Sequence, residues 1–241
     1  MKKTIKKAVD IVMTALILCL MSYQVTGESL HEWIGIGMTV VLIVHHILNG
    51  KWYGALFKGK YNAYRTAATV INTLLLASIA LTAFCGMSMS CHAVPFLYGM
   101  ANMVFTRIAH LALSYWSFIL MGIHLGLHLP AMTVKVKPGK AAKVICTALF
   151  IVIAGIGLYL FIKNGIPGYI TFRTHFAFFD NDKAAVLVFI ENLAELFFFV
   201  FIGANAFRLI RSLNGKAQKK KNPRMPADVT AWLDANGINR K

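Results

Sequence analysis

Long apolar stretches, separated by short polar connections, run along most of the chain. Each stretch holds about 18 or more largely apolar residues, the length that a helix needs to cross a hydrocarbon core of roughly 30 Å. The connections carry turn-forming pairs such as Asn49-Gly50, Pro138-Gly139 and Pro167-Gly168. The pattern therefore predicts an all-α polytopic membrane protein with six transmembrane helices. These helices are expected at approximately residues 8–23, 30–49, 66–89, 104–129, 143–163 and 184–208.

Composition agrees with this pattern and excludes an ordinary soluble domain. Hydrophobic residues make up 58% of the chain and charged residues only 14%, with a mean hydropathy of +0.63. A net charge of +16 would suit nucleic-acid binding if the positive residues formed one surface. They gather instead in alternate connections between the apolar stretches, which is typical of membrane topology. We therefore expect the lipid bilayer as the surroundings of this chain and no nucleic-acid partner.

The basic residues also predict the orientation. Of the 25 Lys and Arg, 21 lie before the first stretch, in the connections after the second and fourth stretches, or in the tail from Arg208 onward. Because positively charged connections stay on the cytoplasmic side, we expect an inner-membrane protein with both termini in the cytoplasm. The opposite face keeps only Arg107, Lys163, Arg173 and Lys183.

The chain divides into three predicted parts. A four-helix membrane bundle is expected over residues 1–130, two further transmembrane helices with an outer loop over 131–212, and a basic cytoplasmic tail over 213–241. The first apolar stretch contains Asp10 and has only a weak cleavage site at Val25-Thr26-Gly27. A spanning helix is the favoured interpretation there, with a cleaved signal peptide as the alternative.

Four histidines repeat one spacing within the apolar stretches. His31 and His45 are fourteen residues apart on the second stretch, and His110 and His124 are fourteen apart on the fourth. Fourteen residues advance a helix by about 21 Å and rotate it by only about −40°, so each pair stays on one face. Both stretches run from outside to inside in the predicted topology. His31 should therefore lie level with His110, and His45 with His124.

Two such cross-helix pairs suit two haem groups at two depths. Each pair can supply both axial nitrogens to one iron, with His31 and His110 holding an outer haem b and His45 and His124 an inner one. The alternative ligands are His46, about 60° from the His31 face, and His128, at the end of its helix. Hydrogen-bonded histidines that only stabilise helix contacts are the competing interpretation, which a single membrane histidine would favour.

The same residues carry a family resemblance. The runs are His31-Glu32-Trp33-Ile34-Gly35, His45-His46-Ile47-Leu48-Asn49, and His110 followed by His124-Leu125-Gly126-Leu127-His128. Over residues 5–130 the chain resembles the flavinylation-associated cytochrome family, with a similar but less distinct continuation from residue 140. The resemblance implies a b-type membrane cytochrome that passes electrons outward, with an extracytoplasmic FMN-carrying protein as its partner.

Other motifs are few. The four cysteines form no CxxC or CxxCH, which argues against covalent haem and a cysteine-ligated zinc site. The favoured interpretation of Cys85 and Cys91 is two buried thiols, with a disulfide as the alternative. No GxGxxG, Walker loop or Ser-His-Asp spacing is present. Whether the protein is itself an enzyme stays open. The sequence predicts an electron-transfer subunit that has no catalytic domain of its own and receives its electrons from a partner or a membrane quinol.

Charged residues at membrane depth keep two alternative functions open. Glu191 and Glu195 lie four apart on the last stretch, where carboxyl groups are costly unless neutral or paired. They suit either a proton-coupled role or hydrogen bonds that lock helix packing. Arg107 and Arg173 on the outer side are candidates for binding haem propionates or a flavin phosphate, or for anchoring the chain at the membrane interface. The alternatives to a di-haem cytochrome are a proton-coupled transporter and a cofactor-free membrane anchor of a redox complex.

Overall fold

The computed structural model describes residues 2–133, 139–180 and 182–221, and in these residues the chain is helical with no strand. The predicted all-α fold is confirmed. In chain order the elements are α1 (Lys2–Met21), α2 (Tyr23–Leu48), α3 (Lys51–Leu56), α4 (Ala63–Met89), the 3-10 helix η1 (Pro95–Leu97), α5 (Met103–Thr133), α6 (Lys140–Lys163), α7 (Ile166–Ile170) and α8 (Ala185–Lys221).

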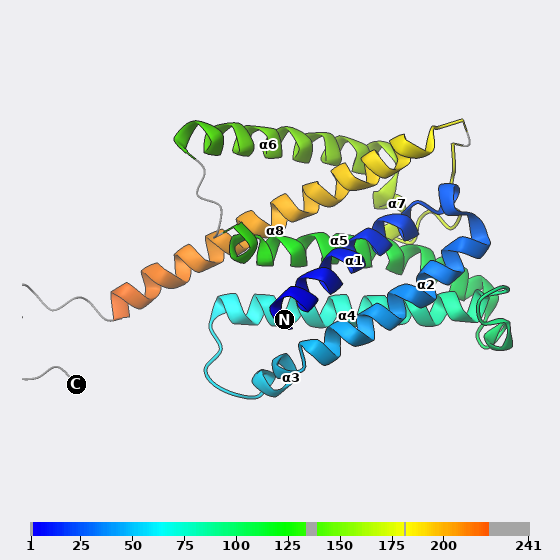
Figure 1. Ribbon diagram of the computed structural model, residues 1–241, viewed down its shortest axis with the longest axis horizontal. Helices are drawn as coiled ribbons and strands as arrows, with labels where there is room; N and C mark the ends of the chain where they lie inside the picture. Colours follow the sequence, from blue (N-terminus) through cyan, green and yellow to red (C-terminus); the bar gives the residue numbers. More distant parts are fainter. Residues whose placement is uncertain (1, 134–138, 181, 222–241) are drawn as a thin grey trace, which may run out of the picture.

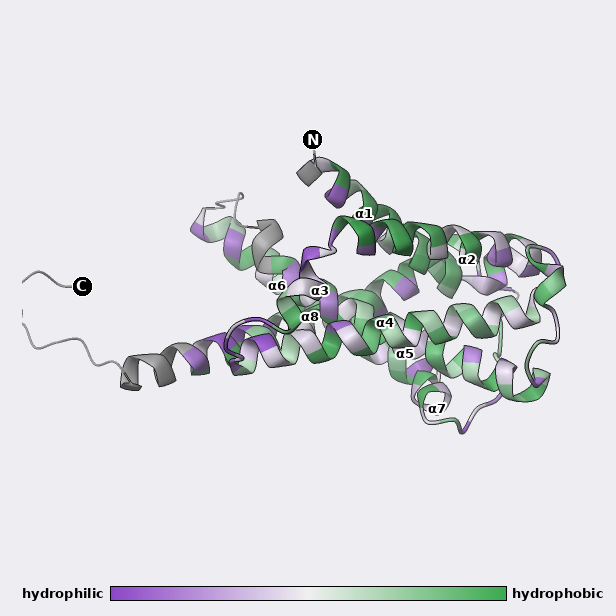
Figure 2. Ribbon diagram, turned by 90° about the horizontal axis from the view of Figure 1, so that it is seen from below, coloured by the Kyte–Doolittle hydropathy of each residue, from purple (hydrophilic) through white to green (hydrophobic). Residues whose placement is uncertain are grey.

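The long helices run alternately in opposite directions along one bundle (Figure 1). Helices α1, α4 and α6 run one way, and α2, α5 and α8 return. We call the end where α1, α4 and α6 begin the inner end and the opposite end the outer end. Apolar residues dominate the middle of the helices and polar residues gather towards their ends (Figure 2). This distribution is typical of helices that cross a bilayer.

Among the residues that the structure describes, five helices are long and apolar enough to cross a membrane, namely α2, α4, α5, α6 and α8. They coincide with five of the six predicted spans. The remaining predicted span forms helix α1, but Lys6, Lys7 and Asp10 interrupt its apolar sequence. Helix α1 nevertheless packs along α2 and contributes Met13 and Ile17 to the core. The chain is thus a polytopic membrane protein with a less apolar first helix.

A tight break at Ser22 separates α1 from α2. Gly27 adopts a positive φ of 67° just beyond it, a conformation that glycine accepts without strain. The Ser22 hydroxyl is fully buried, donates to the Leu18 carbonyl (2.8 Å) and accepts from Asn192 Nδ2 of α8 (2.9 Å). This bond ties the α1–α2 turn to a helix that lies 170 residues away in the sequence.

Helix α5 forms the centre of the bundle, with α4 on one side and α8 on another. The core is built around Phe118, which has no exposed surface. Two glycines let α5 and α8 approach closely: a Cβ on Gly126 would lie 2.5 Å from the Val200 carbonyl oxygen, and one on Gly203 would lie 2.5 Å from that of Ile123. Such small residues allow membrane helices to pack closely. Helix α6 packs in turn against α8.

The boundaries of the predicted parts change in two places. Helix α8 continues past the predicted end of the last span at residue 208 and reaches Lys221, so the beginning of the predicted tail is helical. Residues 222–241 of that tail lie outside the described residues, as do residues 134–138 between α5 and α6. All four cysteines are free thiols; Cys85 is buried as expected, whereas Cys91 is exposed.

Candidate functional site

The outer pair of histidines meets across the bundle. The ring centroids of His31 on α2 and His110 on α5 lie 6.1 Å apart, with the rings inclined at 75°. Two imidazoles that share one metal ion have centroids roughly 6 Å apart, from two metal–nitrogen bonds of about 2 Å and two centre-to-nitrogen distances of about 1.1 Å. His31 and His110 therefore lie at the same level of the bundle, and their separation fits the two axial ligands of one iron.

Helix α4 fixes the orientation of the His110 ring. Its Nδ1 lies 3.0 Å from the Thr82 carbonyl oxygen, which can only accept, so Nδ1 carries the proton and Nε2 keeps its lone pair. Gly86, one turn further along α4, makes room for the ring: a Cβ there would lie 3.1 Å from His110 Cε1. Metal-binding histidines ordinarily donate their second ring nitrogen in this way.

His31 has an unpaired nitrogen. Its Nδ1 is buried and has no hydrogen-bond partner of ordinary geometry, while the ring interacts with the Leu20 backbone as a hydrogen-bond partner. The ring contacts Tyr23 edge-on, with centroids 5.0 Å apart. A buried polar nitrogen without a partner is rare and costly in a folded protein. Its position beside His110 is the one expected of a ring whose nitrogen ligates a bound group.

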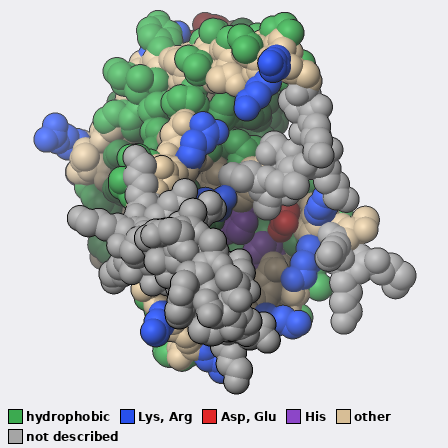
Figure 3. All heavy atoms as spheres, turned by 90° about the vertical axis from the view of Figure 1, so that its left-hand side faces the viewer, with side chains coloured by type: hydrophobic (Ala, Val, Ile, Leu, Met, Phe, Trp, Pro, Cys, Tyr) green, Lys and Arg blue, Asp and Glu red, His purple; other side chains and the backbone are tan. Residues whose placement is uncertain are grey.

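At the inner end, His45 is held by residues of α1 and by the end of its own helix. Its Nδ1 donates to Asp10 Oδ1 (3.0 Å), and the Asn49 amide lies 3.4 Å from its Nε2. Lys6 Nζ donates to Asn49 Oδ1 (2.9 Å). Histidine side chains beside an acidic group lie in a hollow of this end, with Lys and Arg around it (Figure 3). A carboxylate on Nδ1 raises the basicity of Nε2 and suits a ligating histidine.

His124 is oriented by the amide side chain of Asn72 on α4, whose Oδ1 accepts from Nδ1 (2.9 Å). The His128 ring lies 4.7 Å from the His124 ring, and both His45 and His46 are within electrostatic range of His124. Within the described residues no ring contact joins His45 to His124, so the inner pair is more open than the outer pair.

The geometry leaves His46 and His128 as alternative ligands. His46 Nδ1 bonds the Tyr53 hydroxyl (2.8 Å), and its ring lies 5.5 Å from that of His45. His128 is exposed, and α5 continues past it to Thr133, so His128 does not lie at the end of its helix as expected. Orientation by a carboxylate favours His45 over His46, because a phenol hydroxyl is the weaker acceptor for Nδ1–H.

Glu32 is a site residue that sequence reasoning missed. Its carboxylate accepts backbone N–H groups from Cys91 (3.0 Å), His92 (2.7 Å) and Ala93 (2.9 Å), together with the Ser90 hydroxyl (2.7 Å). This set ties the connection after α4 to α2, one residue beyond His31. The position of a carboxyl inside an apolar stretch was visible in the sequence, but partners about 60 residues away were not.

The two carboxyls of α8 are engaged in local bonds. Glu195 is 1% exposed and accepts from Asn164 Nδ2 (2.8 Å), and Lys183 Nζ lies 2.8 Å from Glu191 Oε2. The first bond joins the end of α6 to α8, and the second joins the α7–α8 connection to α8. Both fit the packing role better than a proton relay. Arg107 and Arg173 are exposed, and neither forms an ion pair with any residue that the structure describes.

No protein-family model, curated protein or solved structure matches this chain. The likeness of the histidine runs to the flavinylation-associated cytochromes therefore stays a resemblance. What can be said of function depends on the geometry of the two histidine groups, one at each end of α2 and α5.

Proposed function

We propose that this protein is a di-haem b-type membrane cytochrome that moves electrons across the cytoplasmic membrane. The observation that carries the proposal is the His31–His110 pair, whose rings lie at the separation expected for two ligands of one iron. A haem with two histidine ligands supplies one-electron exchange and has no open position for oxygen. The resemblance to flavinylation-associated cytochromes points to the same function.

The residues around each pair suit this role. For the outer haem, Thr82 would keep the His110 lone pair directed at the iron, and Gly86 would leave space for the imidazole ring of His110. For the inner haem, Asp10 and Asn72 would do the same for His45 and His124. These partners come from α1 and α4, so the four helices of the predicted bundle would each contribute to haem binding.

Two haems about 21 Å apart along the helices would form a relay between the two faces. Since the sequence has no flavin or nicotinamide motif, the electrons would come from a partner or a membrane quinol. An extracytoplasmic FMN-carrying protein is the acceptor that the family resemblance suggests. We place the inner end in the cytoplasm because the basic connections gather there.

Absorption spectra of the detergent-purified protein test the proposal. We expect about two non-covalent haem b per chain with low-spin bis-histidine spectra. His31→Ala or His110→Ala should remove one haem, and His45→Ala or His124→Ala the other. His175→Ala is the matched control, because this histidine lies exposed in an outer connection and should leave both haems in place.

Two results would change the proposal in different ways. If His46→Ala or His128→Ala removes a haem while the neighbouring His45→Ala or His124→Ala does not, the inner ligands are wrong but the cytochrome stands. A folded, colourless protein from haem-replete cells would reject the cytochrome itself. It would leave the transporter and the cofactor-free anchor as the remaining functions.

A further inference from the structure

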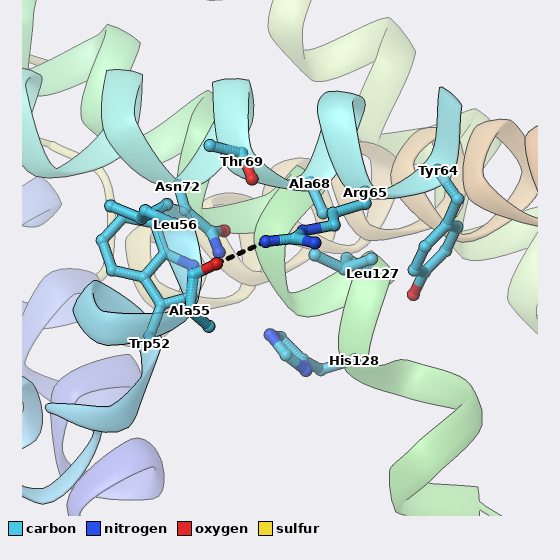
Figure 4. A pocket seen from close by; sticks show the side chains of 10 residues that line it. All are labelled: Trp52, Ala55, Leu56, Tyr64, Arg65, Ala68, Thr69, Asn72, Leu127 and His128. Atoms are coloured by element: carbon cyan, nitrogen blue, oxygen red, sulfur yellow. Dashed lines mark hydrogen bonds between the residues drawn. The ribbon is translucent and has the colours of Figure 1, made fainter. Parts of the chain in front are cut away.

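A pocket of about 250 Å³ opens between α3, α4 and α5 at the inner end (Figure 4). It lies outside the four histidines of the proposed function. Alanine side chains and Leu127 give it an apolar wall, while a guanidinium, an imidazole, an amide and an indole provide polar groups. The lining residues are Trp52, Ala55, Leu56, Tyr64, Arg65, Ala68, Thr69, Asn72, Leu127 and His128.

Arg65 gives this pocket an uncompensated positive charge. Its guanidinium donates to the carbonyl oxygens of Ala55 and Lys60 and lies over the Tyr61 ring, 4.1 Å from the centroid. These partners hold the side chain in place without neutralising it, and no ion pair of Arg65 is found in the described residues. A fixed guanidinium in a partly apolar pocket is suited to a carboxylate or phosphate.

The pocket adjoins the proposed inner haem. Asn72 lines it and also accepts the Nδ1 proton of His124 (2.9 Å). His128 lines it as well, and its ring lies 4.7 Å from the ring of His124. Figure 4 shows the His128 imidazole and the Arg65 side chain entering the same space from α5 and α4. A negatively charged group in this space would therefore lie beside the ligand of the inner iron.

We propose that this pocket binds the carboxylate arms of the inner haem, with Arg65 as their cationic partner. The inference rests on the proposed function. The pocket is suited to the short acidic arms of a porphyrin whose iron is held by His45 and His124. Arg65 and the imidazole of His128 offer N–H donors to carboxylate oxygens. A neutral ring such as a quinone would leave the Arg65 charge without a counter-charge, so a carboxylate is favoured.

Redox titration of the purified holoprotein tests this assignment. A cation beside the haem stabilises the reduced, more negative state, so Arg65→Gln should lower the midpoint potential of the inner haem. The expected fall in the reduction equilibrium constant is about tenfold, which for one electron is about 59 mV. Arg65→Lys keeps the charge and should retain most of the wild-type potential. Lys58→Gln removes an equal charge from the exposed α3–α4 connection and should have a much smaller effect.

Each other outcome has a definite meaning. If both haems titrate in Arg65→Gln as in the wild type, the pocket does not hold the haem carboxylates. If Arg65→Gln leaves the potentials unchanged but loses co-purified anionic lipid phosphate, the pocket is a lipid headgroup site. If Arg65→Gln loses the inner haem and Arg65→Lys restores it with its potential, the assignment holds. A wild-type protein without haem removes the proposed function and this inference together.

Discussion

At the scale of single residues, three histidines of the bundle have Nδ1 held by a group on another helix. In the bundle, Nδ1 of His110, His124 and His45 faces a carbonyl, an amide oxygen and a carboxylate, respectively. Each partner fixes the tautomer and leaves Nε2 as the nitrogen for a metal. In His45 the Asn49 amide lies 3.4 Å from Nε2 and would have to turn away for a metal to bind there. His175, in an outer connection, is exposed and bonds only the Phe172 carbonyl nearby in sequence.

Gly86 provides a test of the outer site at this scale. We expect Gly86→Val to displace the His110 ring, because even a Cβ at this position would lie 3.1 Å from Cε1. Overpacking a close contact costs about 1–3 kcal/mol, so the outer haem should bind roughly fivefold or more weakly while the inner haem is retained. Haem content and redox titration of the purified variant measure this.

The matched control for this substitution is Gly155→Val on α6, where a Cβ would meet nothing within 4 Å. It should leave both haems in place. An unchanged outer haem in Gly86→Val, or an equal loss in Gly155→Val, would show that the contact with His110 does not matter for binding.

The sequence singles out the histidines but does not predict the groups that hydrogen-bond to them. The fourteen-residue spacing predicts that His31 and His110 share a depth, because helix geometry converts spacing into height and azimuth. Thr82 and Asn72 lie 28 and 52 residues from their histidines in the chain. Their contacts depend on how α4 packs against α5, and a hydrophobic pattern does not specify that packing.

At the scale of the elements, one carboxylate connects two helices and a turn. Glu32 on α2 receives three consecutive backbone N–H groups and a hydroxyl from the connection that follows α4. Its side chain is 11% exposed, so these bonds are largely sheltered from water. The connection is in this way fixed at the outer end beside His31, where a docking partner of the relay would approach.

Replacing this carboxylate with an amide should loosen the connection. Glu32→Gln keeps the shape but loses the charge that strengthens the four hydrogen bonds, so we expect a local destabilisation of about 1–3 kcal/mol. The amides of Cys91, His92 and Ala93 should then exchange with deuterium roughly 5- to 150-fold faster. Asp182→Asn is the control, because Asp182 is an exposed carboxylate in another connection. Equal exchange in both variants would exclude Glu32 as the anchor.

Helix ends and helix crossings differ in how well the sequence predicts them. Gly27 interrupts the regular geometry of α2 with a positive φ, which its residue type allows. The crossing of α5 and α8 depends on Gly126 and Gly203 facing each other, which becomes visible only when the two helices are in place. The end of α8 at Lys221 was missed because lysine-rich sequence continues a helix as readily as it forms a polar tail.

At the scale of the whole molecule, the two ends of the bundle differ in charge and in their histidine surroundings. The outer end has the sheltered His31–His110 pair beneath the Glu32 anchor. The inner end has the hydrogen-bonded His45 and Asp10, and most of the basic residues of the chain. A relay built on this plan would exchange electrons with different partners at its two faces. The direction of electron flow between the two faces therefore depends on the orientation of the protein in the membrane.

Reporter fusions measure that orientation. We expect a reporter that is active only outside the cytoplasm to be inactive when fused after Lys241 and active when fused after Asp182, between α7 and α8. The reason is that 21 of the 25 Lys and Arg lie in the connections and tails of the inner end, and moving them across the membrane is disfavoured. A fusion after Gly139, between α5 and α6, should be inactive like the one after Lys241. Activity at Lys241 together with inactivity at Asp182 would reverse the orientation, and the haem proposed between His31 and His110 would then face the cytoplasm.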